Sequence, residues 1–356
     1  MKRVNPKKFS KTKTDNAGIT LNKESISKEQ REEALEILSN WRASHNYPMQ
    51  VFFNRLKRVS EKIDSKALTA QRLKRVPSIL KKLNRKYHGM TKPTMKLTQM
   101  QDIAGCRAVL SNVKLVNKLF KESYLKGDLK HENVKINNYI ENPKYDGYRS
   151  IHLIYRYFSD KGRVDFNNLL IEVQIRSRLQ HIWATAVETV GFFTKQAIKS
   201  NEGEEAWLDF FKLVSSAFAR LERCPLIEGT PENEEKLYNL IKEKAKELDV
   251  IHRMNNWTES IQHVENNFKN KKHLHFYLLE LDINLDKLSI RAYSKRQEEK
   301  AIYDYLTVEK KIYDLPGYDV VLVGADTVQD LKKAYPNYFL DTKEFLKYLQ
   351  KILNKY

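Results

Sequence analysis

Cysteine is scarce in this sequence: the 356 residues contain two, Cys106 and Cys224. Two cysteines can build neither a disulfide framework nor a four-cysteine zinc site, which favours a reducing cytoplasm and argues against structural zinc. Long apolar runs are missing as well. No stretch approaches the roughly 18 residues of a membrane span, and the N-terminal "MKRVNPKKFSKTKT" has no apolar signal core. We therefore expect a cytoplasmic protein without membrane contact.

Acidic residues are outnumbered: 45 Asp and Glu stand against 64 Lys and Arg, which gives a formal charge of +19. Solubility alone does not require such an excess, so it predicts a polyanionic partner, with nucleic acid as the leading candidate. Glycine-rich phosphate loops are also absent, because neither GxxxxGK[ST] nor GxGxxG occurs. Any phosphate must therefore be held by side chains.

Apolar periodicity predicts strands separated by helices up to about residue 225. Residues 1–22 are basic without a period and predict a flexible arm. The stretch from Ser25 predicts two helices broken near Tyr47-Pro48, with Ser27 and Gln30 as a capping box. The further segments expected are a strand or loop leading into a helix in "TAQRLKRVPSILKKLNRKY", a helix over 113–126, a long helix from about residue 179, and strands in "DIAGCRAVLS", 151–158 and "LLIEVQIRS". This order predicts an α+β fold, a mixed sheet flanked by helices.

The character of the chain changes after Pro225. A charged helical stretch leads to a predicted hairpin in "HFYLLELDINLDKLSIRAYS", a strand in "YDVVLVGAD" and two C-terminal helices broken at Pro336. We predict two domains, 1–225 and 226–356, the second a smaller α+β unit. His273 and His275 form an alternating pair without a third ligand, which is more typical of a strand surface than of a metal site.

An unusual stretch, "NPKYDGYRSIHLIYRY", spans residues 142–157. It combines basic side chains, tyrosines, a histidine and a turn at Asp146-Gly147, where glycine permits a sharply bent backbone. It predicts a basic loop that leads into a half-buried strand. The alternative is an edge hairpin whose tyrosines only pack and whose charges are solvated.

Two further patterns point to phosphate chemistry. "RLKRVPSILKK" places Ser78 and Lys82 on one helical face, with Arg75 just before it, which suits an extended polyphosphate, although a solvated basic helix would look the same. Asp102 and Glu172 stand inside segments that read as buried strands. Buried carboxylates are costly unless paired or metal-bound, so Mg²⁺ carrying nucleotide phosphates is one explanation and a salt bridge to a neighbouring arginine is the other.

Four motifs in order, "RLKRVPSILKK", "DIAGCRAV", "YIENPKYDGYRSIH" and "EVQIRSRLQHIWATAVE", resemble the synthetase domain of RelA/SpoT-like enzymes over residues 40–195. The resemblance implies an ATP pyrophosphokinase that moves the β,γ-pyrophosphate onto a 3'-hydroxyl. It implies Asp102 and Glu172 as magnesium ligands, with Glu172 also accepting the acceptor's proton. The remaining roles that it implies are an acceptor site of Lys144, Tyr148, Arg149, His152, Gln174 and Arg176, and ATP binding by Arg72, Lys74, Ser78, Lys82 and Arg107.

The residues before the tyrosine-rich loop depart from the nucleotide-specific members of this family. Those members carry a charged tetrad where this chain reads "KINN", Lys135 to Asn138. We also expect no alarmone-hydrolase segment upstream. "NWRASHNYPMQVF" resembles the helical lead-in of the short, toxic members, for which the resemblance implies the 3'-terminal adenosine of tRNA as acceptor, and no DNA. A charge of +19 fits tRNA better than a mononucleotide.

The C-terminal stretch "VVLVGADTVQDLKKAYPNYFLDTKEFLKYL" resembles the CapRel family, fused toxin–antitoxins of phage defence whose C-terminal domain is like a zinc finger without zinc. Tyr335 and Tyr338 fall where that family has a YxxY element that covers the ATP pocket. A phage protein, the major capsid protein, is the implied trigger. Simple packing is the alternative for both tyrosines.

Three hypotheses follow. The chain is a self-inhibited tRNA pyrophosphokinase that blocks translation, an alarmone synthetase that makes guanosine or adenosine pyrophosphates, or an inactive RNA-binding module. Retention of Asp102 and Glu172 argues against the third.

Overall fold

The computed structural model describes residues 8–23, 25–85, 94–160, 162–197, 204–260, 262–264, 274–282, 284, 285, 287–312, 315, 317–324 and 342–355. Its helices are α1 (Lys11–Leu21), α2 (Lys28–Ser44), α3 (Asn46–Ile63), α4 (Val76–Leu83), α5 (Val113–Leu119), α6 (Arg178–Ala197), α7 (Glu204–Glu222), α8 (Glu234–Glu247), α9 (Val250–Ser260), α10 (Glu298–Ile312) and α12 (Lys343–Leu353). Its strands are β1 (Leu68–Leu73), β2 (Ala104–Leu110), β3 (Glu132–Asn138), β4 (Ile151–Arg156), β5 (Leu170–Ser177), β6 (Gln262–Val264), β7 (Leu274–Asp282), β8 (Lys287–Ser294) and β9 (Tyr318–Gly324).

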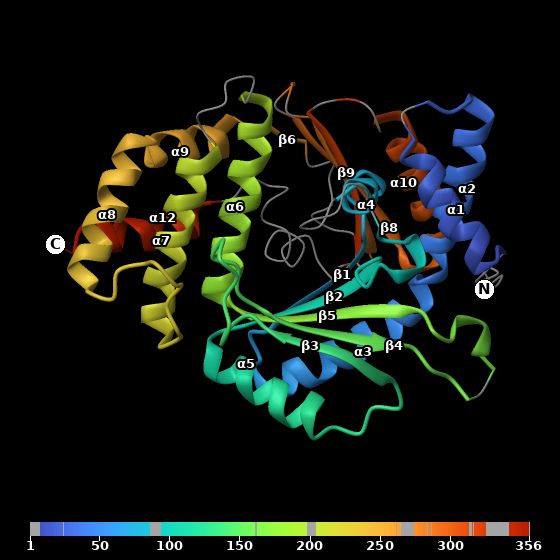
Figure 1. The fold of residues 1–356 in the computed structure, drawn as a ribbon, viewed down its shortest axis with the longest axis horizontal. Coiled ribbons are helices and arrows are strands. Elements are labelled where there is room, and N and C mark those ends of the chain that lie inside the picture. Colours follow the sequence, from blue (N-terminus) through green and yellow to red (C-terminus); the bar gives the residue numbers. More distant parts are fainter. Residues whose placement is uncertain are drawn as a thin grey trace.

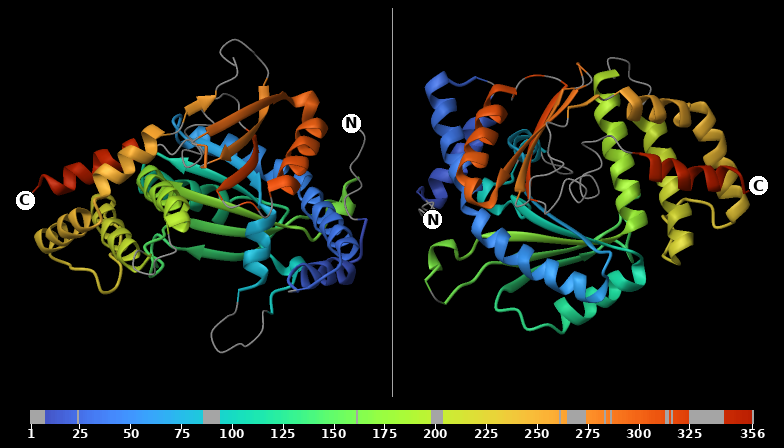
Figure 2. Two further views of the ribbon diagram at one scale, coloured as in Figure 1. Left: turned by 90° about the horizontal axis from the view of Figure 1, so that it is seen from above. Right: turned by 180° about the vertical axis from the view of Figure 1, so that it is seen from behind.

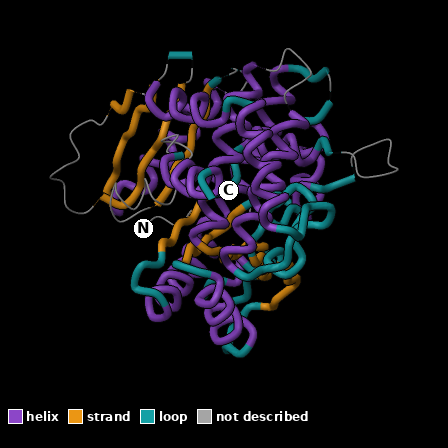
Figure 3. Tube along the Cα trace, turned by 90° about the vertical axis from the view of Figure 1, so that its left-hand side faces the viewer, coloured by secondary structure: helices purple, strands orange, loops and turns teal. Residues whose placement is uncertain are grey.

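The described strands form one mixed sheet in the order β3-β4-β5-β2-β1-β9-β7-β8-β6. Strands β2 and β5 run parallel, whereas β4 is antiparallel to β5 and β1 is antiparallel to β2. The two groups β1–β5 and β6–β9 join at a single register pair, Gln71 with Gly324, and they lie at an angle to each other (Figures 1 and 3). The predicted mixed sheet flanked by helices is confirmed.

Three apolar cores hold these layers together. One lies between β1–β5 and the helices α3, α4 and α5, with α3 and α5 on one face of the sheet (Figures 1 and 2). A second joins α6, α7, α8, α9 and α12, and a third joins α10 to β7–β9. Residue 225, the predicted domain boundary, lies between α7 and α8, which share the second core. The division into two domains stays a prediction.

The N-terminal arm is in part a helix, so the prediction of a flexible arm is wrong for residues 11–21. Ser10 caps α1 by accepting a hydrogen bond from the Lys13 backbone N–H. Gly18 lets α1 approach the core closely, because a Cβ there would lie 3.2 Å from Cβ of Leu97. A contact made by small residues gives no apolar period, and this explains why the sequence pattern missed the helix.

The next two helices follow the prediction closely. Ser27 and Gln30 form the expected capping box at the start of α2. The break lies at His45, two residues before the predicted Tyr47-Pro48, and Pro48 is tolerated in the first turn of α3. Within the described ranges, no helix is both long enough and apolar enough to cross a bilayer.

The tyrosine-rich stretch leads into β4, which lies between β3 and β5. The alternative of an edge hairpin holds in part, because β4 pairs antiparallel with the edge strand β3, although β4 itself is not the edge strand. Strand β3 at the sheet edge was not expected, because "ENVKINN" has two apolar residues, Val134 and Ile136, and both are exposed, so its alternation is too short to predict a strand. Tyr155 and Tyr157 do pack in the core, as the packing alternative held.

Candidate active site

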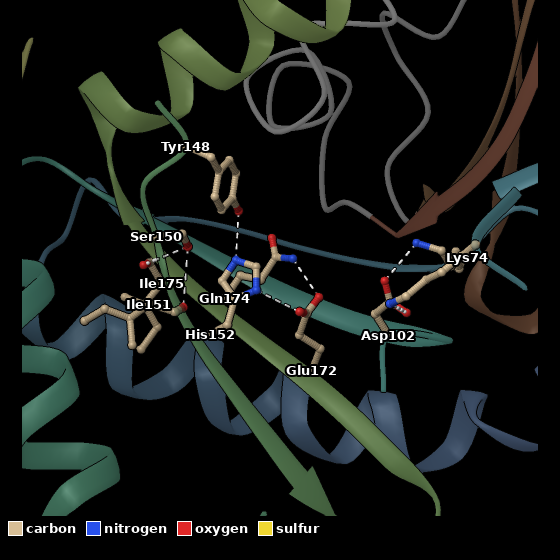
Figure 4. Close-up of polar contacts among 10 residues, drawn as sticks. Lys74, Asp102, Tyr148, Ser150, Ile151, His152, Glu172, Gln174 and Ile175 are labelled. Atoms are coloured by element: carbon tan, nitrogen blue, oxygen red, sulfur yellow. Dashed lines mark hydrogen bonds and ion pairs between the residues drawn. The ribbon is translucent and has the colours of Figure 1, made fainter. Parts of the chain in front are cut away.

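A row of side chains crosses the face of the sheet opposite α3. Register pairs place Arg72 beside Gly105, Gly105 beside Glu172, and His152 beside Gln174. Directly paired residues on adjacent strands point to the same face. Four strands therefore direct their polar side chains into one region above the sheet (Figure 4).

A cavity of about 110 Å³ occupies part of this region. Its lining residues are Ala70, Arg72, Lys74, Asp102, Gly105, Cys106, Arg107, Glu172 and Gln174. Both carboxylates and three of the basic residues predicted from the sequence thus line one space.

Asp102 lies between two lysines at the end of the cavity near α4. Lys74 Nζ is 2.8 Å from Oδ2 of Asp102, and Lys82 Nζ is 2.8 Å from its Oδ1. Burial would raise the pKa of Asp102, but the two ammonium groups outweigh it and the pKa lies below its usual value. Asp102 is therefore held as a carboxylate, and both lysines are anchored at one point.

Glu172 is the second carboxylate, and both of its oxygens accept hydrogen bonds. His152 Nδ1 lies 2.8 Å from Oε1, and Gln174 Nε2 donates to Oε2 at 2.7 Å. Burial alone would raise the pKa of Glu172, but the hydrogen bond and electrostatic attraction of His152 and the hydrogen bond from Gln174 together outweigh it, and the pKa lies below its usual value. Glu172 is thus kept ionised and oriented at the centre of the sheet (Figure 4).

His152 connects Glu172 to Tyr148. The Tyr148 hydroxyl lies 2.8 Å from Nε2 of His152. Because a carboxylate can only accept, Nδ1 of a neutral His152 carries the proton toward Glu172, which leaves Nε2 to accept from the tyrosine. Burial raises the pKa of Tyr148, so its hydroxyl stays protonated as a donor. The three side chains form a directed chain, tyrosine to histidine to carboxylate.

The acceptor loop adds an aromatic contact that the sequence patterns did not single out. The Lys144 ammonium lies 4.8 Å from the ring centre of Tyr139 and 5.1 Å from that of Tyr148. Tyr139 also contacts His152 edge to face, with ring centres 5.3 Å apart. The clue available in the sequence was one more tyrosine just before the loop. The structure brings Lys144, Tyr148 and His152 together as predicted, and it adds Tyr139.

Arg149 does not join this group. Its side chain is 4% exposed, and its guanidinium donates to Ser215 Oγ, to the Ile140 carbonyl and to the Pro225 carbonyl. These bonds fix the base of the loop to α7, in place of the predicted contact with acceptor phosphates. Gly147 completes the attachment: its φ is +98°, and a Cβ there would lie 2.8 Å from Trp183.

Positive charge gathers beneath Tyr148. Arg176 is 3% exposed, and one Nη atom lies 2.5 Å from Nδ1 of His181. Burial and the neighbouring Arg107 lower the pKa of Arg176 to about 9. A buried guanidinium next to a second one favours an anion close by. Arg107 lines the cavity itself, and Ser78 is half-buried on α4 one turn before Lys82.

The donor set fits Mg²⁺ brought in with nucleotide phosphates. Magnesium is commonly bound through one or two carboxylates together with phosphate oxygens and water, and Asp102 and Glu172 are the two carboxylates that line this cavity. Across the described part of the chain, no cluster of three or more His, Cys, Asp or Glu residues could hold a metal without a substrate. Tyr335 and Tyr338 lie outside the described residues.

Comparison with known proteins places this site in a recognised region. Residues 71–194, which contain both carboxylates and the basic residues of the cavity, match the family model described as the region found in RelA / SpoT proteins. The GTP pyrophosphokinase YwaC of Bacillus subtilis is 35% identical over 118 residues, which are 33% of this chain and 54% of that protein. The GTP pyrophosphokinase YjbM of the same organism is 31% identical over 121 residues, 34% and 54% of the two chains. The chain spans about half the length of these curated relatives.

Two solved structures resemble this chain to about the same extent as each other. The small alarmone synthetase 1 of Bacillus subtilis bound to its product pppGpp has 24% identity and a TM-score of 0.43, over 55% of this chain and 94% of that chain. The small alarmone synthetase 2 of the same organism has 22% identity and a TM-score of 0.41, over 52% and 93%.

Proposed function

We propose that this chain is a RelA/SpoT-like ATP pyrophosphokinase that transfers the β,γ-pyrophosphate of ATP to the 3'-hydroxyl at the end of tRNA. The observation that carries the proposal is the pair of ionised carboxylates, Asp102 and Glu172, in one cavity with Lys74, Arg72 and Arg107. Phosphoryl-type transfer requires positioning and charge neutralisation more than covalent chemistry. This donor set supplies both.

The two lysines that contact Asp102 can change partners when the nucleotide binds. Lys74 and Lys82 both pair with Asp102 here, and the same ammonium groups are expected to move to the polyphosphate when it arrives. Asp102 would then be free to hold Mg²⁺ together with Glu172. The bound ion would neutralise charge that develops on the phosphate oxygens. The protein's own part is to keep Asp102 ionised and the two lysines within reach.

In the transfer, the 3'-oxygen of the acceptor attacks the β-phosphorus and the bond from that phosphorus to the α,β-bridging oxygen breaks, so AMP leaves. The proton of the attacking hydroxyl passes to Glu172. His152 and Gln174 orient the Glu172 carboxylate for this step through their hydrogen bonds. Tyr148 in turn orients His152 through its hydroxyl and offers its ring to the acceptor base.

Charge and the rim of the acceptor loop support tRNA as the acceptor. The net charge of +19 favours a polyanion larger than a mononucleotide. At the position of the charged tetrad of nucleotide-specific relatives, this chain has Asn137 and Asn138, and Asn138 uses its side-chain oxygen to accept from the Ile140 and Glu141 backbone N–H groups. The Asn138 side chain therefore shapes the turn. As an uncharged amide it also cannot pair with the charges of a free nucleotide.

An alarmone synthetase is the second candidate, and the names of the two curated relatives favour it, since both are called GTP pyrophosphokinases. Incubation with γ-labelled ATP and either tRNA or a mixture of GDP, GTP and AMP separates the candidates. Label on RNA supports the first proposal, and label on a guanosine or adenosine nucleotide supports the second. Magnesium-dependent formation of AMP without a labelled acceptor would contradict both.

Self-inhibition in phage defence is the regulatory part of the proposal. It rests on the resemblance of Tyr335 and Tyr338 to a YxxY element that covers the ATP pocket, with a phage capsid protein as trigger. For an idle toxin to be harmless, the open state should be about one per cent populated or less. We expect Tyr338→Ala to arrest growth without a trigger and the added Glu172→Gln to restore it. A well-folded Tyr338→Ala chain that leaves growth unchanged would contradict self-inhibition by this pair.

A further inference from the structure

A buried polar cluster joins the C-terminal part of the chain to the N-terminal part. Helices α2 and α10 lie side by side (Figures 1 and 2). Arg42 of α2 donates to Glu309 Oε2 at 2.8 Å and to the Tyr305 hydroxyl at 2.7 Å. Tyr305 in turn donates to Oε1 of Glu309 at 2.6 Å. Arg42 is 1% exposed and Glu309 is 5% exposed.

Glu309 also reaches the start of α4. Its Oε1 accepts from the backbone N–H of Val76 at 2.9 Å. Val76 is the first residue of α4, and the residue before it, Arg75, provides no side-chain cap. The first N–H groups of a helix need an acceptor, and a carboxylate there is favoured by the helix dipole. This cap is supplied from 233 residues away in the sequence.

Two more contacts from β9 hold the same segment. Asp319 forms an ion pair with Arg75, and Gly324 pairs with Gln71 of β1. The segment 72–82, which contains Arg72, Lys74, Ser78 and Lys82, is therefore fixed by α10 at the helix start and by β9 at the adjoining strand. Four of the five proposed ATP-binding side chains thus lie within it, and the fifth, Arg107, lies on β2.

We infer that Glu309, held by Arg42 and Tyr305, is a positioning residue for nucleotide binding: it sets the place of α4 and thereby the aim of Lys82 and Ser78 at the ATP phosphates. The inference rests on the proposed function for the identity of the ligand. Burial disfavours the charge of Arg42, yet Glu309 and Tyr305 more than compensate and hold the pKa of Arg42 above its usual value. Arg42 therefore stays charged at any physiological pH. Through Glu309, the C-terminal part of the chain thus helps to position the proposed phosphate-binding side chains of α4.

The test replaces both charges at once, because removal of one partner would leave the other buried and uncompensated. In full-length protein, Arg42→Met with Glu309→Leu removes the cap but keeps apolar volume. The control is the double variant Arg291→Met with Glu280→Leu. It removes a half-exposed ion pair of the C-terminal part of the chain, in which Arg291 on β8 lies 2.7 Å from Glu280 on β7. Both proteins, each also carrying Tyr338→Ala to remove the proposed brake, are compared with Tyr338→Ala alone by hydrogen exchange and by titration with α,β-methylene ATP and with tRNA.

We expect the Arg42/Glu309 variant to bind α,β-methylene ATP roughly tenfold more weakly, a typical effect of losing a helix cap and its alignment. The amides of α4 should exchange faster than in the control, while tRNA affinity and exchange in α6 stay unchanged. Equal weakening for the ATP analogue and for tRNA would indicate general loosening and overturn the inference, as would unchanged exchange in α4.

A milder variant covers the case in which the double change prevents folding. Tyr305→Phe removes one hydroxyl from the cluster and should weaken binding of the ATP analogue by about threefold, the usual effect of one hydrogen bond. An unchanged affinity in folded Tyr305→Phe would overturn the inference. A Tyr338→Ala protein that does not bind the analogue at all would refute the proposed function instead, and exchange in α4 would still decide whether Glu309 positions the helix.

Discussion

His152 holds Glu172 through a 2.8 Å contact between its Nδ1 atom and Oε1 of the carboxylate. The same imidazole is bonded on its other side to the hydroxyl of Tyr148. The geometry therefore ties the residue proposed to stack on the acceptor to the residue proposed to take its proton. Correct placement of the acceptor base and correct orientation of the proton acceptor depend on one another.

The variants of Glu172, Tyr148 and Lys82 are best measured in a parent chain that carries Tyr338→Ala, which removes the proposed brake. In that chain, Glu172→Gln should abolish transfer while the fold persists. The amide keeps the shape of the side chain but removes the negative charge, so neither a proton nor a metal ion can be held, and losses of several orders of magnitude are typical. Glu132→Gln is the matched control, since Glu132 pairs with Arg156 at the edge of the sheet. Turnover of Glu172→Gln within about tenfold of the parent would rule out the assignment.

Two substitutions separate the contribution of the Tyr148 ring from that of its hydroxyl. Tyr148→Ala should weaken acceptor use by about 1 to 3 kcal/mol, the usual value of a base–aromatic stack. Tyr148→Phe keeps the ring but loses the hydrogen bond to His152, so the acceptor KM should stay near the parent value while kcat falls. Identical kinetics for all three proteins would show that Tyr148 only packs.

Neighbouring lysines on α4 provide an internal comparison. Lys82 pairs with Asp102, whereas Lys81 is exposed. Lys82→Met should raise the KM for ATP by roughly tenfold, the effect of losing one charge-assisted contact, and Lys81→Met should leave it unchanged. If both variants behave alike, the effect of Lys82 reflects the general charge of the helix.

The sequence predicted the two carboxylates because acids inside apolar strands need a reason, and both line the cavity. It could not predict the fate of Arg149, since the acceptors of its guanidinium include Ser215 and Pro225, which the fold brings in from far along the chain. The Arg42–Glu309 cluster could not be predicted either, because its two charged residues lie 267 positions apart in the sequence. Strand β3 was missed because it is an edge strand with two exposed apolar residues, Val134 and Ile136, and so short an alternation does not predict a strand.

The raised pKa of Glu222 predicts how the stability of the fold depends on pH. It accepts a bond from Gln180, and burial raises its pKa to about 7. The folded chain thus holds a proton that the unfolded chain releases near its usual pKa of about 4.3, so stability is lost as pH rises between these values. Glu222→Gln should raise the melting temperature at pH 8 by about 2 to 4 °C and leave it unchanged at pH 4. Glu228→Gln, at an exposed position, should do neither.

The most direct test of the central claim uses tRNA whose terminal ribose is either intact or oxidised by periodate, which converts the 2',3'-diol into two aldehydes and so removes the 3'-hydroxyl. The chain carrying Tyr338→Ala, which removes the proposed brake, is incubated with either tRNA, GDP, GTP, γ-labelled ATP and Mg²⁺. The account predicts labelled intact tRNA, release of one AMP per transfer, no label on oxidised tRNA, and no transfer when Glu172→Gln is added. Label that appears on GTP or GDP but not on intact tRNA, or that appears equally on oxidised tRNA, would contradict it.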